Sequence, residues 1–180
     1  MSLLVSQGMS NIPIQQFRRA TPGSAVWKPL HAELVVWLPD HPPVRREILD
    51  FSDGPSDWIL RPDASGAEAS LRFDGRGLLA TLRGPERADL EIDFIVPQEG
   101  LSLPLWAITH GPQAEVSIWD HFGRLVVVDV LARGPDAEPL QLDAGRYVLA
   151  GSVQRVSSVL LGLGLDAAQA GDIRGRRAAG

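Results

Sequence analysis

Short segments in which apolar and polar residues alternate recur along most of the chain, and turn-forming residues separate them. The clearest example is Asp89–Val96, in which acidic residues at 89, 91 and 93 alternate with Leu90, Ile92, Phe94 and Val96. A period of two residues places successive side chains on opposite faces of a β-strand. We therefore expect an antiparallel strand with one face in the core and the other in water.

The same reasoning predicts nine further strands, bounded by Gly, Pro, Asp and Ser residues. They are Ala32–Leu38, Glu47–Phe51, Trp58–Arg61, Ala69–Phe73, Leu78–Arg83, Leu103–Thr109, Glu115–Trp119, Leu125–Leu131 and Arg146–Val153. Many short strands without intervening helical segments indicate an all-β fold, and we predict an antiparallel β-sandwich with Greek-key character. A barrel is the alternative, whereas a dinucleotide-binding α/β fold is not expected.

Two segments have special patterns. Leu125–Leu131 is β-branched and apolar on both faces, which predicts a central strand. Val156, Val159, Leu160 and Leu163 follow the i, i+3, i+4, i+7 spacing of a helix, which predicts at most one short C-terminal helix. A strand is also compatible with this second segment.

The only tyrosine, Tyr147, follows Leu142 and Gly145 in an L-x-x-G-x-Y pattern. This pattern resembles the tyrosine corner of Greek-key sandwiches, in which the phenol donates a hydrogen bond to the backbone a few residues upstream. We expect these three residues to have a structural role, because a fold motif does not by itself specify a function.

Charge and composition divide the chain into three parts. Residues 1–20 are expected to be a flexible leader, 21–166 a single sandwich domain, and 167–180 a disordered tail rich in Ala, Gly and Arg. Neither a signal peptide nor a run of about 18 apolar residues is present, so we expect a cytoplasmic protein without membrane contact. Because both ends are basic, the domain itself is more acidic than the net charge of −5 implies.

The residue inventory excludes several kinds of chemistry. The absence of cysteine excludes disulfides, thiolate metal sites and thiol nucleophiles. The acidic balance disfavours binding to nucleic acid phosphates. The chain has no serine-hydrolase elbow and no complete dinucleotide loop, so no cofactor is expected and catalysis is less favoured than binding.

One candidate site consists of His41, His110, Asp120 and His121, which lie near predicted strand ends. Three imidazoles and a carboxylate are suitable ligands for Zn²⁺ or another divalent metal. If one end of the sandwich gathers them, they would support a metal-dependent enzyme or small-molecule binder. Their spacing matches no compact metal-ligand motif, so ordinary turn residues are the competing interpretation.

A second candidate site is a strand surface that contains His31, Glu33, Trp37 and Trp119, all predicted on faces opposite the core. Outward tryptophans often contact partner proteins, although terminal segments could equally cover them. The favoured hypothesis is an acidic interaction module that binds a protein partner, in the manner of an inhibitor or immunity protein. Self-association through exposed tryptophan faces, as a structural subunit, is a further alternative.

Overall fold

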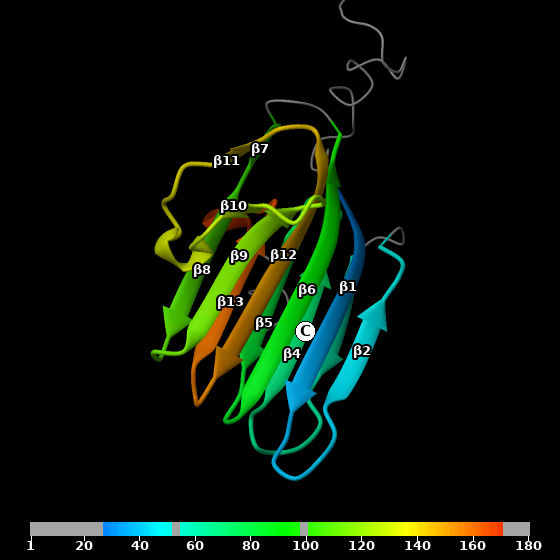
Figure 1. The fold of residues 1–180 in the computed structure, drawn as a ribbon, viewed down its shortest axis with the longest axis vertical. Helices are drawn as coiled ribbons and strands as arrows, with labels where there is room; N and C mark the ends of the chain where they lie inside the picture. Colours follow the sequence, from blue (N-terminus) through cyan, green and yellow to red (C-terminus); the bar gives the residue numbers. More distant parts are fainter. Residues whose placement is uncertain (1–26, 52–54, 98–100, 171–180) are drawn as a thin grey trace, which may run out of the picture.

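The computed structural model describes residues 27–51, 55–97 and 101–170, and within them antiparallel strands form two facing sheets (Figure 1). Sheet A has the order β10 (Leu125–Val127), β9 (Ala114–Asp120), β12 (Gly145–Gln154), β6 (Arg87–Val96), β1 (Lys28–Trp37) and β2 (Val44–Ile48). Sheet B has the order β3 (Ser56–Leu60), β4 (Glu68–Phe73), β5 (Leu78–Arg83), β13 (Ser158–Leu163) and β8 (Leu105–His110). A small pair, β7 (Leu101–Leu103) and β11 (Leu140–Leu142), and the 3₁₀ turn η1 (Val130–Ala132) complete the described elements.

The all-β, sandwich-like architecture predicted from the alternating pattern is therefore confirmed. Neighbouring strands are often distant in sequence, since β12 lies between β6 and β9, and β13 lies between β5 and β8. The Greek-key description stays a prediction. In the part of the chain that the structure describes, no helix has the length and apolar character needed to cross a membrane.

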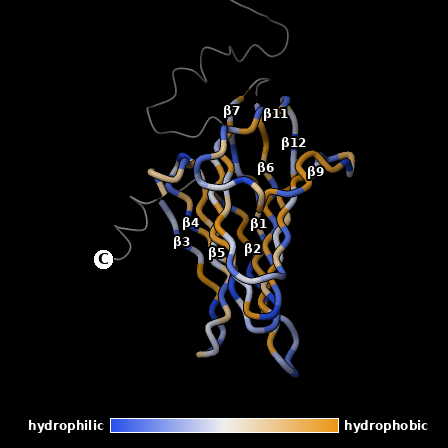
Figure 2. The backbone as a smooth tube through the Cα atoms, turned by 90° about the vertical axis from the view of Figure 1, so that its left-hand side faces the viewer, coloured by the Kyte–Doolittle hydropathy of each residue, from blue (hydrophilic) through white to orange (hydrophobic). Residues whose placement is uncertain are grey.

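The core lies between the sheets and consists of the inward residues of each strand. Leu34 on β1, Ile92 and Phe94 on β6, Ile118 on β9 and Leu149 on β12 are almost completely buried. Hydrophobic and hydrophilic residues both occur along the strands in Figure 2, and the burial of β6 alternates residue by residue, as a two-residue period requires. The predicted inward and outward faces of β1 and β6 are confirmed.

The segment predicted as a central strand, Leu125–Leu131, is different in the structure. Only Leu125–Val127 forms a strand, β10, and it lies at the edge of sheet A with β9 as its partner. The chain then bends, and Val130–Ala132 forms η1. The prediction of a central strand was wrong, because β-branched composition does not reveal which neighbours are available for pairing.

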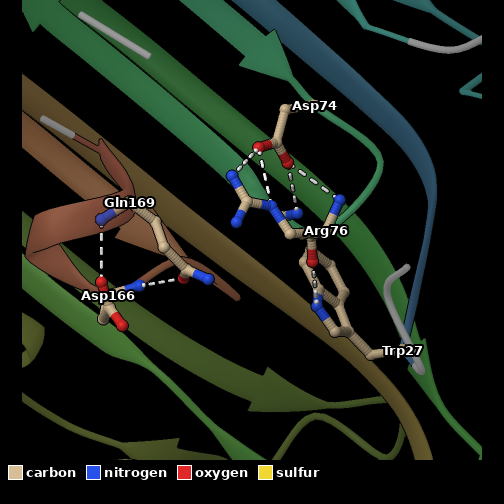
Figure 3. Close-up of polar contacts among 6 residues, drawn as sticks. Trp27, Asp74, Arg76, Asp166 and Gln169 are labelled. Atoms are coloured by element: carbon tan, nitrogen blue, oxygen red, sulfur yellow. Dashed lines mark hydrogen bonds and ion pairs between the residues drawn. The ribbon is translucent and has the colours of Figure 1, made fainter. Parts of the chain in front are cut away.

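Of the two interpretations of the C-terminal segment, the strand is confirmed and the helix is not, because Ser158–Leu163 is strand β13, paired with β5 on one side and β8 on the other. An α-helical turn comes later, at residues 167–170, where a disordered tail was predicted. Asp166 and Gln169 fix its start by reciprocal side-chain to backbone hydrogen bonds of 2.8 and 2.9 Å (Figure 3). The predicted leader, 1–20, and the rest of the tail, 171–180, lie outside the described residues.

The tyrosine corner has the expected hydrogen bond. Tyr147 is buried, stacks on Phe94, and donates from its hydroxyl to the carbonyl oxygen of Asp143, four residues upstream, at 2.8 Å. Burial raises the pKa of the Tyr147 phenol, and the nearby carboxylates of Asp143 and Asp120 raise it further. The phenol therefore keeps the proton that it donates.

Replacing Tyr147 with phenylalanine should lower the free energy of unfolding by about 1–3 kcal/mol, because the Asp143 carbonyl loses its donor. Urea denaturation measures this change. Thr109→Val is a suitable control, because the Thr109 hydroxyl oxygen is buried without a hydrogen-bond partner among the described residues. A Tyr147→Phe variant as stable as the wild type would show that the corner does not stabilise the fold.

Candidate functional site

All four residues of the predicted interaction surface lie on the outer face of sheet A, with Trp119 on the third strand away from the other three. His31, Glu33 and Trp37 project from β1 between the buried residues of that strand, and Trp119 projects from β9. The strand register aligns His31 with Asp93 on β6, and Asp93 in turn, through β12, with Trp119. Four strands therefore contribute to one surface.

Carboxylates lie in adjacent positions across this face. Glu33 is directly opposite Glu47 on β2 and directly opposite Glu91 on β6. Like charges in directly opposed positions of a sheet destabilise it. A row of three glutamates across β2, β1 and β6 is thus unfavourable for the free domain. The alternating sequence pattern could not predict this row, because it does not show that the three strands are neighbours.

Basic residues compensate part of this negative charge. Arg45 lies 3.5 Å from Glu33, Arg87 lies 2.9 Å from Asp89, and Arg146 lies 2.8 Å from Asp93. His31 lies 3.1 Å from Glu47. Glu91 and Glu115, both exposed, have no ion pair with any residue that the structure describes. The face is therefore only partly neutralised.

A shallow hollow of about 330 Å³ lies within this surface. At one side, the Trp37 indole donates to the Asp89 carboxylate at 3.1 Å, and the Arg87 guanidinium lies 5.4 Å from the centre of the Trp37 ring. Ser152 lines the hollow, and its hydroxyl oxygen is buried without a hydrogen-bond partner in the described structure. The hollow thus offers carboxylates and an aromatic ring to a ligand.

The proposed metal residues do not come together. His110 ends β8 and His41 follows β1, at the end of the sandwich where β9 begins, whereas Asp120 and His121 lie at the far end of β9. The expectation that one end gathers all four was wrong, because a whole strand separates the two pairs. Asp120 instead accepts hydrogen bonds from the backbone N–H groups of Phe122 and Arg124. No group of three or more potential ligands is found among the described residues.

The outer face of sheet B also has a groove, which includes the buried Glu68. Arg61 and Ser70 each donate to the Glu68 carboxylate at 2.9 Å. Burial raises the pKa of Glu68, but the hydrogen bonds from Arg61 and Ser70 outweigh it, so the pKa lies below its ordinary value of 4.5. A fully paired, ionised carboxylate indicates a structural role rather than an acid or base.

Comparisons of the chain with protein-family models, with curated proteins and with solved structures gave no match. The chemistry of the surface is therefore the basis on which a function is proposed.

Proposed function

We propose that the protein is an interaction module that binds a positively charged segment of a partner protein on the outer face of sheet A. The observation that carries this proposal is the row Glu47, Glu33 and Glu91, three carboxylates opposed across adjacent strands. Arg45 and His31 already lie beside Glu33 and Glu47, so a cationic partner would add its charge mainly at Glu91, the member of the row without an ion pair among the described residues.

The chemistry of the surrounding face supports a protein segment rather than a metal ion. Trp37 and Trp119 offer aromatic surface at the two sides of the acidic row, and Trp119 is 38% exposed. Arginine side chains stack on such rings and also form bidentate pairs with carboxylates. An arginine-rich segment that lies across β1, β6 and β12 would use both kinds of contact.

Charge also governs how fast such a partner arrives. A surface with an excess of one charge attracts the opposite charge over several ångströms and accelerates association, and added salt screens this effect. We expect the association rate with an arginine-rich peptide to fall steeply between low and physiological salt. A glutamate-rich peptide of equal length is the control and should not bind.

A substitution tests whether the face itself is responsible. Glu91→Lys should weaken binding of the arginine-rich peptide roughly fivefold or more, because it removes an unpaired carboxylate and adds a repelling charge. Asp136→Lys, in an exposed loop before β11, changes the net charge equally and should have a much smaller effect. Titration calorimetry measures both affinities. Equal losses in the two variants would mean that only net charge matters, and would contradict the proposed site.

A further inference from the structure

The groove on the outer face of sheet B, with a volume of about 930 Å³, contains a polar row that crosses four strands. Arg83 of β5 lies directly opposite Glu68 of β4 and directly opposite Ser158 of β13. Ser158 in turn lies opposite His110 of β8. All four residues line the groove. The row therefore combines a carboxylate, a guanidinium, a hydroxyl and an imidazole.

The positive charge of this row is not neutralised within the described structure. The carboxylate of Glu68 already accepts hydrogen bonds from Arg61 and Ser70. Arg83 is exposed and has no salt bridge with any residue that the structure describes. In the same part of the chain, the side chains of Ser158 and His110 have no hydrogen bond. The groove thus has one cation that is available to an anion, with two further polar groups beside it.

The spacing of the row suits a carboxylate. Neighbouring strands are about 4.8 Å apart, so the backbones of Arg83 and His110, with one strand between them, are about 10 Å apart. Both side chains can reach a group that lies above Ser158. A guanidinium donates two parallel hydrogen bonds to a carboxylate, and a hydroxyl and an imidazole N–H can each donate one more. Because only one cation is unpaired, a singly charged carboxylate matches the row better than a phosphate dianion.

Apolar side chains continue the groove beyond the polar row. Two residues further along the strands, and therefore about 7 Å away, Leu160 of β13 lies opposite Ile108 of β8. Ile108 is 36% exposed, and Val156, at the same groove, is 80% exposed. Leu79 and Leu160 also pack in the apolar cluster of Trp106. A ligand with both a carboxylate and an apolar body can contact the two parts of the groove at once.

We propose that this groove binds an organic carboxylate that carries an apolar body. Its carboxylate lies above Ser158, between Arg83 and His110. Its apolar body lies on Ile108 and Leu160, where it covers apolar surface that is otherwise exposed to water. This inference is independent of the proposed function, because the acidic row lies on the outer face of the other sheet.

Titration calorimetry of the full chain with four small probes tests the chemistry of the ligand. Octanoate should bind with a dissociation constant of about 1 mM or lower, and acetate should bind at least tenfold more weakly because it has no apolar body. Octylamine, which has the opposite charge, should not bind. Absence of octanoate binding overturns the proposal, and so does octylamine binding of equal strength. Octyl phosphate that binds more tightly than octanoate overturns the choice of a carboxylate.

Two pairs of variants test the location of the site. Arg83→Gln should weaken octanoate binding roughly tenfold, whereas Arg46→Gln, at an exposed position on β2 of the other sheet, should leave it unchanged. Ile108→Asn should weaken it roughly threefold or more, and Ile95→Asn is the matched control, because Ile95 is 37% exposed. Circular dichroism of the four variants establishes that they are folded. If either groove variant binds octanoate as tightly as its control, the ligand does not occupy this groove.

Discussion

Trp106→Ala is expected to lower the free energy of unfolding by about 3–5 kcal/mol, which is the usual cost of removing a large buried aromatic side chain. Trp106 projects from the outer face of sheet B, yet it is only 4% exposed. Leu79, Leu165 and Ala170 pack around it in a second apolar cluster, separate from the core between the sheets. The substitution leaves a cavity that these neighbours can fill only in part.

The indole also holds the C-terminal segment in place. Its N–H donates to the carbonyl oxygen of Leu165 at 2.8 Å, directly before the helical turn at residues 167–170. Without this hydrogen bond, the amide hydrogens of the turn should exchange faster than they do in the wild type, and the increase should be larger than in the strands. Urea denaturation and hydrogen exchange measure the two effects. Trp119→Ala, at an exposed position, should change the stability by about 1 kcal/mol or less. Equal effects in the two variants would contradict this account of Trp106.

The alternating pattern predicted much of the fold because it reports directly on burial. The predicted strand Leu78–Arg83 has the same bounds as β5, and Asp89–Val96 differs from β6 only at its start. The pattern is weaker for Glu47–Phe51, since the observed strand β2 spans Val44–Ile48. Here the pairing with β1 decides the bounds, and a single strand carries no information on its partner.

Edges and strand order are tertiary properties, and they explain why local spacing left the state of one segment undecided. Val156–Leu163 has apolar residues at positions that suit a helix, but the pairing of β13 with both β5 and β8 selects the extended form. Its glycine at 162 favours this outcome, because Trp106 on β8 lies across it. Local spacing cannot show that a tryptophan far earlier in the chain will fill that position.

The same limit applies to the candidate sites. The alternation placed Glu33 and Glu91 on the polar sides of their own strands, but only the register of β1 with β6 sets them opposite each other. The histidines were grouped because they lie near strand ends, whereas the direction of β9 places them at opposite ends of the sandwich. Residue types were therefore predictable, and their spatial grouping was not.

Gly164→Ala should destabilise the protein by about 3 kcal/mol or more, for two separate reasons. The φ angle of Gly164 is +82°, a conformation in which a side chain is strained. In addition, a Cβ atom there would lie 2.4 Å from the indole nitrogen of Trp27. Trp27 cannot move freely, because its N–H donates to the carbonyl oxygen of Arg76 at 3.1 Å (Figure 3) and its ring packs edge-on against Phe94.

Two further variants separate these causes. Gly75 has a φ angle of +91° and nothing within 4 Å of a Cβ atom, so Gly75→Ala should cost only the backbone strain, roughly 1–2 kcal/mol. In a Trp27→Ala background the clash is absent, and Gly164→Ala should then cost about as much as Gly75→Ala. Urea denaturation of the wild type, Gly164→Ala, Trp27→Ala and the double variant measures the free energy lost to the clash with Trp27. The Gly75→Ala variant measures the free energy lost to backbone strain alone. If the cost at Gly164 is unchanged without the indole, the contact with Trp27 does not explain why glycine occupies this position.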